Sequence, residues 1–245
     1  MAGGPASAQR VLCPVCHEDK TPQERRLGSR VFAVAPECAC DRAARERDRA
    51  EQERRDQDEA YRRRLEASGL PRRYQRATFD GFSAAPGTEK ALAAAREFAE
   101  TFAREAEDGL LVRGPTGAGK THLAAAVAMT LLRRGFSVSF WNVPLLLDAL
   151  RPGGDKPDAE IMARARRVDL LILDDLGTEK ATEWAQERLY VLTEYRYEDA
   201  RPLIVTTNAS LRELQELLSP KTVSRLAEMT RGVTLDAPDY RLRRR

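Results

Sequence analysis

The chain has 245 residues, a length that accommodates one α/β domain and a small additional unit. Hydrophobic residues make up 42% of it and charged residues 32%, and no run approaches the roughly 18 apolar residues that a membrane helix needs. Residues 1–10 lack the apolar core of a secretory signal, so we expect a cytoplasmic protein with no membrane partner.

All the cysteines of the chain lie within its first 40 residues, in two tight pairs: Cys13, Cys16, Cys38 and Cys40. The two turns offer four thiolates, the ligand set that tetrahedral Zn²⁺ requires, and His17 is a spare ligand. We therefore expect residues 1–40 to form a zinc-binding unit that the metal folds, because so small a unit has no hydrophobic core. Reduced thiols without metal, or a redox pair, are the alternatives.

Residues 41–68 are expected to form a charged helical linker. They are rich in Arg, Glu, Ala and Gln, and opposite charges recur at three- and four-residue spacing, which favours an exposed helix. A coiled coil is not favoured, because no apolar heptad is sustained. Gly69 and Pro71 end this helix, so the main domain is expected to span residues 69–245.

The main domain alternates strands and helices, the pattern of an α/β fold with a parallel sheet flanked by helices. An Ala-rich helix is expected over 88–106. Five strands are expected over 109–113, 136–141, 168–174, 202–207 and 233–235. Helices are expected over 120–133, 144–150, 159–166, 182–199, 211–217 and 221–229.

A phosphate-binding loop follows the first of these strands. Its consensus, G-x-x-x-x-G-K-[ST], is matched in full by Gly114, Pro115, Thr116, Gly117, Ala118, Gly119, Lys120 and Thr121. The glycines let backbone N–H groups turn toward phosphate oxygens, and the helix N-terminus adds positive potential. Lys120 is expected to reach the β- and γ-phosphates of ATP, and Thr121 to offer its hydroxyl to Mg²⁺. His122 is expected near the nucleotide in the first helical turn, without a catalytic role.

Two acids, Asp174 and Asp175, end the apolar strand 168–174. The carboxyl edge of a parallel sheet is where ligands of open α/β folds bind. We therefore expect Asp174 to hold Mg²⁺ and Asp175 to orient or deprotonate the attacking water. Surface acids that merely cap a strand are the alternative.

Asn208 and Arg225 give weaker signals. Asn208 ends the strand 202–207, where its amide is placed to orient the water, although Asn also ends strands for turn reasons. Arg225 lies in the last expected helix, where it serves either as an arginine finger for a neighbouring subunit or as one half of an ordinary surface salt bridge.

These elements, in this order, resemble the AAA+ ATPases, and more closely the DnaC/DnaI-type replicative helicase loaders and their IstB-like relatives. The resemblance covers about residues 69–241 and rests on segments 70–74, 117–124, 140–144, 171–177, 195–197, 204–208 and 224–226. It implies that Asp174 binds Mg²⁺, that Asp175 activates water, that Asn208 is sensor 1 and that Arg225 is the finger.

Two departures from the family pattern matter. Many AAA+ proteins have Glu where this chain has Asp175, a shorter acid, so we expect slow hydrolysis. Only about ten residues follow the last expected strand, so the helical lid domain is expected to be absent or truncated. Arg241 is then the nearest substitute for the sensor-2 arginine.

The segment 144–167 lies where related initiators carry a DNA-facing insertion. Its basic residues, which could meet the phosphates of single-stranded DNA, are Arg151, Lys156, Arg164, Arg166 and Arg167. A solvated basic helix face is the alternative. The net charge of +3 neither requires nor excludes such a partner.

The resemblance implies a loader that carries a hexameric replicative helicase to single-stranded DNA. Its cysteine unit would contact the helicase, and its AAA+ cores would form an ATP-dependent homo-oligomer with ATP between subunits. The alternatives are an IstB-like regulator of a transposase, a branch that typically lacks the cysteine unit, and a zinc-bearing adaptor that uses ATP binding as a switch with little turnover.

Overall fold

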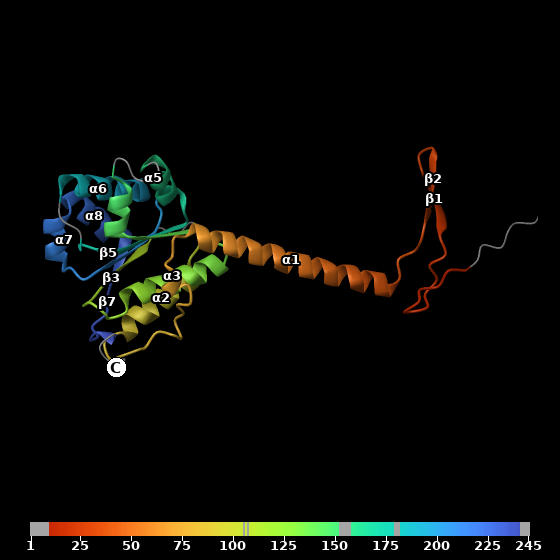
Figure 1. Ribbon diagram of the computed structural model, residues 1–245, viewed down its shortest axis with the longest axis horizontal. Coiled ribbons are helices and arrows are strands. Elements are labelled where there is room, and N and C mark those ends of the chain that lie inside the picture. Colours follow the sequence, from red (N-terminus) through yellow and green to blue (C-terminus); the bar gives the residue numbers. More distant parts are fainter. Residues whose placement is uncertain (1–9, 105, 107, 152–157, 179–181, 241–245) are drawn as a thin grey trace, which may run out of the picture. The chain divides into compact units, whose positions relative to one another are not determined.

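The computed structural model describes residues 10–104, 106, 108–151, 158–178 and 182–240. The chain divides into two compact units, one ending at Ala60 and the other beginning at Tyr61 (Figure 1). Lys156 and Arg241, to which the sequence analysis gave a role, lie outside the described residues. Among the described helices, none combines the length and the apolar character that crossing a bilayer requires.

The N-terminal unit contains a β-hairpin next to the cysteines. Strand β1 (Gln23–Leu27) pairs antiparallel with β2 (Arg30–Val34) through a two-residue turn that begins at Gly28 with φ of 65°. The hairpin was not expected from the sequence, because QERRL in β1 is polar and lacks the β-branched and aromatic residues that mark a strand.

Helix α1 (Ala39–Ala67) confirms that the charged stretch is helical. All its residues are exposed or partly exposed, and i,i+4 ion pairs such as Arg49–Glu53 and Arg55–Glu51 run along it. Near its end Tyr61 and Leu65 pack on the core of the second unit, to which they belong. The helix ends before Gly69, whose φ of 72° is a left-handed conformation that glycine adopts without strain.

The second unit is built on a five-stranded sheet in which every pair is parallel, as predicted. Its strand order is β4-β5-β6-β3-β7. The bounds of the strands are β3 (Gly109–Arg113), β4 (Val138–Asn142), β5 (Leu170–Leu176), β6 (Leu203–Thr207) and β7 (Thr230–Thr234).

Helices cover both faces of this sheet (Figure 1). Successive residues of a strand point to opposite faces, so Leu110 and Val112 pack with α2 and α3 while Leu111 packs with the helices of the other face. The helices are η1 (Arg72–Tyr74, a 3₁₀ turn), α2 (Glu89–Thr101), α3 (Lys120–Arg133), α4 (Val143–Ala149), α5 (Asp158–Arg167), α6 (Glu183–Glu198), α7 (Leu211–Leu217) and α8 (Pro220–Met229).

Helix α2 is shorter than predicted, because it ends at Thr101 instead of residue 106. Phe102 leaves the helical conformation and turns its ring inward, where it contacts Phe98 and Phe136 edge to face. The guanidinium of Arg134 then donates hydrogen bonds to the carbonyls of Ala99 and Phe102, which satisfies the C-terminal end of the helix. Tertiary contacts therefore override the helix propensity of the residues that follow.

Arg196 of α6 is fully buried at the amino edge of the sheet. Its guanidinium donates to five backbone carbonyls, and burial lowers the pKa of the group to about 9, so that it stays charged at neutral pH. The acceptors lie at the end of α5, just before β5 and just before β6: Ala165, Arg166, Val168, Asp169 and Pro202. One side chain thus ties three segments together where two adjacent strands begin.

Replacing Arg196 with Met is expected to lower the free energy of unfolding by roughly 3 kcal/mol or more, because buried carbonyls would lose their donor. Urea unfolding of the purified protein measures this change. The matched control is Arg212→Met, which breaks only an exposed i,i+4 pair with Glu216 and should cost less than about 1 kcal/mol. Equal losses in the two variants would contradict the role assigned to Arg196.

Candidate nucleotide-binding site

The phosphate-binding loop joins β3 to α3 as the motif predicts. Gly119, at the N-terminal cap of α3, has φ of 99°, and a Cβ there would lie 2.7 Å from the ring of Phe82. Glycine is therefore required both by the backbone and by its neighbour. Lys120 is buried, and its ammonium donates to the carbonyls of Gly114 and Pro115, at 2.9 Å each. The loop thus holds a buried cation in its curve, an arrangement that suits a phosphate group.

Asp174 is buried beside the first turn of α3. It accepts hydrogen bonds from Thr121 Oγ1 at 3.1 Å and from Thr206 Oγ1 at 2.7 Å. Burial raises the pKa of its carboxyl to about 6. A hydroxyl and a carboxylate oxygen in contact are the hard oxygen ligands that Mg²⁺ prefers, so Thr121 and Asp174 fit the predicted metal. The ion would neutralise charge on the phosphates.

Asp175 lies in a β-bulge. The pairing of β5 with β6 shifts register between Leu173 and Leu176, and Asp175 has φ of 59°. Its N–H donates to Thr206 Oγ1 at 3.0 Å, and its carboxylate accepts from Asn142 Nδ2 at 3.2 Å. The prediction that the strand ends at residue 174 is therefore wrong, since β5 continues to Leu176. Because of the bulge, the two adjacent acids lie in different surroundings: Asp174 is buried in the fold, and Asp175 lines a cavity.

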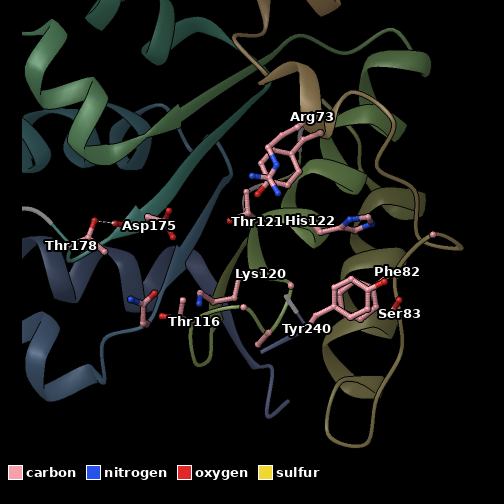
Figure 2. A pocket seen from close by; sticks show the side chains of 16 residues that line it. Arg73, Phe82, Ser83, Thr116, Lys120, Thr121, His122, Asp175, Thr178 and Tyr240 are labelled. Atoms are coloured by element: carbon pink, nitrogen blue, oxygen red, sulfur yellow. Dashed lines mark hydrogen bonds between the residues drawn. The ribbon is translucent and has the colours of Figure 1, made fainter. Parts of the chain in front are cut away.

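A cavity of about 540 Å³ opens above the loop. Figure 2 shows Thr116, Lys120 and Thr121 between Asp175 on one side and Phe82 and Tyr240 on the other. The lining includes nine residues that the sequence analysis assigned to the site: Thr116, Gly117, Ala118, Gly119, Lys120, Thr121, His122, Asp175 and Asn208. A cavity of this size accommodates a nucleotide.

Several lining residues were not predicted. Arg73, Tyr74, Phe82 and Ser83 come from the segment before α2, and Tyr240 comes from the end of the described chain. The aromatic character of residues 74–82 was the available signal, whereas nothing in the sequence marks Tyr240. Phe82, Ser83 and Tyr240 lie on the side of the cavity away from Asp175, where the ring of Phe82 is 5.8 Å from that of His122, whereas Arg73 lies above Thr121 in the view.

Arg225 lies outside this cavity, on α8. Its guanidinium pairs with both carboxylate oxygens of Glu194, at 3.2 and 3.4 Å, and stacks 3.7 Å from the ring centre of Tyr197. Within one chain, Arg225 therefore forms a salt bridge between α6 and α8, which is the alternative to the arginine finger that the sequence left open. A role in a neighbouring subunit stays a prediction.

The predicted basic face of α5 is partly neutralised. Arg166 pairs with Asp199 through two hydrogen bonds of 2.8 and 3.2 Å and stacks on Tyr195. Arg164 is half-buried, and burial lowers its pKa. Because Arg166 is paired with Asp199 and Arg164 is half-buried, this face offers less exposed positive charge to phosphates than a count of arginines suggests, and DNA contact there stays a prediction.

The four cysteines of the N-terminal unit meet at one point. Their sulfur atoms lie within 4.8 Å of one another, and Cys13 and Cys38 are buried. Hydrogen bonds from the backbone N–H groups of Cys16 and Val15 lower the pKa of Cys13 to about 7, whereas the interaction with Cys16 raises the pKa of Cys40 to about 12. Crowded thiols that compete for charge in this way fit a tetrahedral Zn²⁺ ion, which would stabilise all four as thiolates.

Asp174→Asn is expected to stabilise the metal-free protein in a pH-dependent way. The raised pKa means that the folded state binds more protons than the unfolded state between the ordinary value of 3.8 and about 6, so ionisation costs stability as pH rises through this range. Asn does not ionise, so the variant should exceed the wild type by up to roughly 3 kcal/mol at pH 7 and by little below pH 4. Chemical unfolding in chelator at several pH values measures the difference, and a pH-independent difference would contradict the assignment.

The cysteine cluster is expected to bind one Zn²⁺ per chain, measured by elemental analysis and by the absorption of the Co²⁺-substituted protein. Cys16→Ser should abolish tetrahedral Co²⁺ absorption or weaken binding by at least about tenfold, because one thiolate is lost. His17→Asn is the matched control, since exposed His17 lies outside the cluster and its φ of 58° suits Asn. Equal metal binding in the wild type and Cys16→Ser would contradict the site.

Known proteins match most of this chain, including the whole second unit. The family of IstB-like ATP binding proteins matches residues 46–245. An insertion-sequence ATP-binding protein of Mycobacterium tuberculosis is 30% identical over 201 residues, which cover 77% of this chain and 79% of that protein. The replicative helicase loader DnaC of Escherichia coli is 27% identical over 172 residues, which cover 67% of this chain and 68% of the loader.

The fold agrees with these relatives. The crystal structure of the DnaC helicase loader superposes with a TM-score of 0.61 and 28% identity, and the match covers 67% of this chain and 99% of that one. The cysteine cluster precedes residue 46 and therefore lies outside the family match. The second unit has the AAA+ fold, and the chain belongs to the family of IstB-like ATP-binding proteins.

Proposed function

We propose that this protein is an ATP-driven loader that delivers a hexameric replicative helicase to single-stranded DNA. The observation that carries the choice is the cysteine cluster, a separate unit in front of the family core. A zinc-folded unit offers a second binding surface beside the ATPase, which a carrier of another protein needs. The likeness to DnaC over 99% of its crystallised chain supports the same role for the core.

ATP would act at the junction between copies of the chain. Lys120 and the loop N–H groups would hold the phosphates, Thr121 and Asp174 the Mg²⁺, and Asp175 and Asn208 the attacking water. Arg225 would leave Glu194 and reach the γ-phosphate of a neighbouring copy. Because Asp175 is a short acid that is also held by Asn142, we propose slow hydrolysis, so that the ATP-bound assembly lasts long enough to hold the helicase.

The second candidate function is regulation of a transposase. It is favoured by the 30% identity with an insertion-sequence protein over 79% of that protein's length. The third is an adaptor that binds ATP as a switch with negligible turnover. Single-turnover hydrolysis of ATP, with and without single-stranded DNA, separates the adaptor from the two ATPases.

The decisive experiment is a pull-down of the replicative DNA helicase from the same cell by the zinc-loaded protein, with and without ATP. We expect stoichiometric capture that depends on ATP and is at least about tenfold weaker for Cys16→Ser, because the zinc unit would carry the contact. His17→Asn is the matched control. Failure of the intact protein to bind this helicase, together with capture of a transposase, would overturn the loader in favour of the second candidate.

The same preparation tests the proposed finger. Arg225→Ala should reduce ATP hydrolysis by roughly 10³-fold at concentrations where the protein assembles, because transition-state charge would lose its partner. Mixing it with Lys120→Ala should restore part of the activity, since a Lys120→Ala copy supplies an intact finger to the intact ATP site of its neighbour. If Arg225→Ala hydrolyses ATP like the wild type at every concentration, the arginine is only the salt-bridge partner of Glu194.

A further inference from the structure

The chain after β7 passes along the phosphate-binding loop. Leu235 donates its N–H to the carbonyl of Arg113 at 2.7 Å, and Asp236 donates to the carbonyl of Gly87 at 3.2 Å. Leu235 and Ala237 are buried, so this part of the segment is anchored in the fold. The residues that follow, 238–240, are exposed or half-buried, and they lie where the loop turns toward α3.

The carboxylate of Asp239 rests directly on the loop. A Cβ built on Gly117 would lie 1.8 Å from Asp239 Oδ1, so the carboxylate takes the space that a side chain would fill. Tyr240 donates its N–H to the carbonyl of Gly117 at 3.1 Å, and its ring lines the nucleotide cavity. Figure 2 shows Tyr240 between Lys120 of the loop and Phe82.

The carboxylate of Asp239 thus lies on a loop whose own groups favour an anion. The loop offers a buried Lys120 and the N-terminus of α3, and both favour an anion whether it is a carboxylate or a phosphate. We propose that Asp239 is an affinity-setting residue of the nucleotide site, whose carboxylate occupies the space beside Gly117 in the nucleotide-free chain and is repelled by the phosphates that bind there.

The segment around Asp239 is little buried. The last buried residue before it is Ala237, and beyond that point Pro238 and Tyr240 are exposed, so moving the carboxylate uncovers little apolar surface. The repulsion between the carboxylate and a bound phosphate is the larger energy, because two unit charges about 5 Å apart interact by close to 1 kcal/mol even in water. ATP should feel this repulsion more than ADP, since it carries one more phosphate.

The test measures the dissociation constants of Mg·ATP and Mg·ADP by calorimetry. Asp239→Asn and Asp239→Ala should each bind Mg·ATP roughly three- to tenfold more tightly than the wild type, with a smaller gain for ADP, and the gain should shrink at high salt. Asp236→Asn is the matched control, because it removes the same charge from an exposed residue of the same segment that does not touch Gly117. It should change binding less than twofold. Thermal melting establishes that each variant is folded.

Equal gains in Asp239→Asn and Asp236→Asn would overturn the inference, because net charge alone would then explain the effect. Weaker binding by folded Asp239→Asn and Asp239→Ala would overturn it too, since the carboxylate would then support the loop. The inference rests on ATP binding at the loop, not on helicase loading. Lys120→Ala, which should bind no nucleotide, shows that the measured site is the phosphate loop. Failure to capture a helicase would leave the inference untouched.

Discussion

The buried carboxylate of Asp174 is the constraint on which the candidate site depends. It accepts one hydrogen bond from α3, through Thr121, and one from β6, through Thr206, so a single group fixes the loop helix against two strands. An uncompensated carboxylate at this depth is costly, which is why its pKa rises. An Mg²⁺ ion held by this carboxylate would remove the cost, so the group that destabilises the metal-free fold would favour the metal-bound one.

Arg196 performs the complementary task at the opposite edge of the sheet. Strands β5 and β6 begin beside its guanidinium and end beside Asp174, so one buried cation and one buried anion define both ends of the same strand pair. The cation binds backbone carbonyls, which makes it independent of neighbouring side chains. The anion accepts hydrogen bonds from hydroxyls, which could exchange partners if a metal ion bound there. The contacts of Arg196 thus fix the amino edge of the sheet, whereas those of Asp174 leave the carboxyl edge able to accept a ligand.

Much of this architecture is readable from the sequence, because it follows from local rules. The alternation of apolar strands with helices predicted every strand of the parallel sheet to within a few residues, and the glycine-lysine motif predicted the loop that joins β3 to α3. What the sequence hid depends on pairing and packing. The bulge at Asp175 comes from its register with β6, the role of Arg196 comes from carbonyls on three segments, and Tyr240 reaches the cavity only through the fold.

The nucleotide-free site is a balance of charges that a nucleotide would reset. Carboxylates lie around the loop and its cavity on two parts of the chain: Asp174 and Asp175 on β5, and Asp239 on the segment after β7. Phosphates would bring negative charge and Mg²⁺ positive charge, so the pair would attract the carboxylate of Asp174 and repel that of Asp239. A nucleotide would then act on this chain at two places, through the metal at the sheet edge and through the segment that lies on the loop.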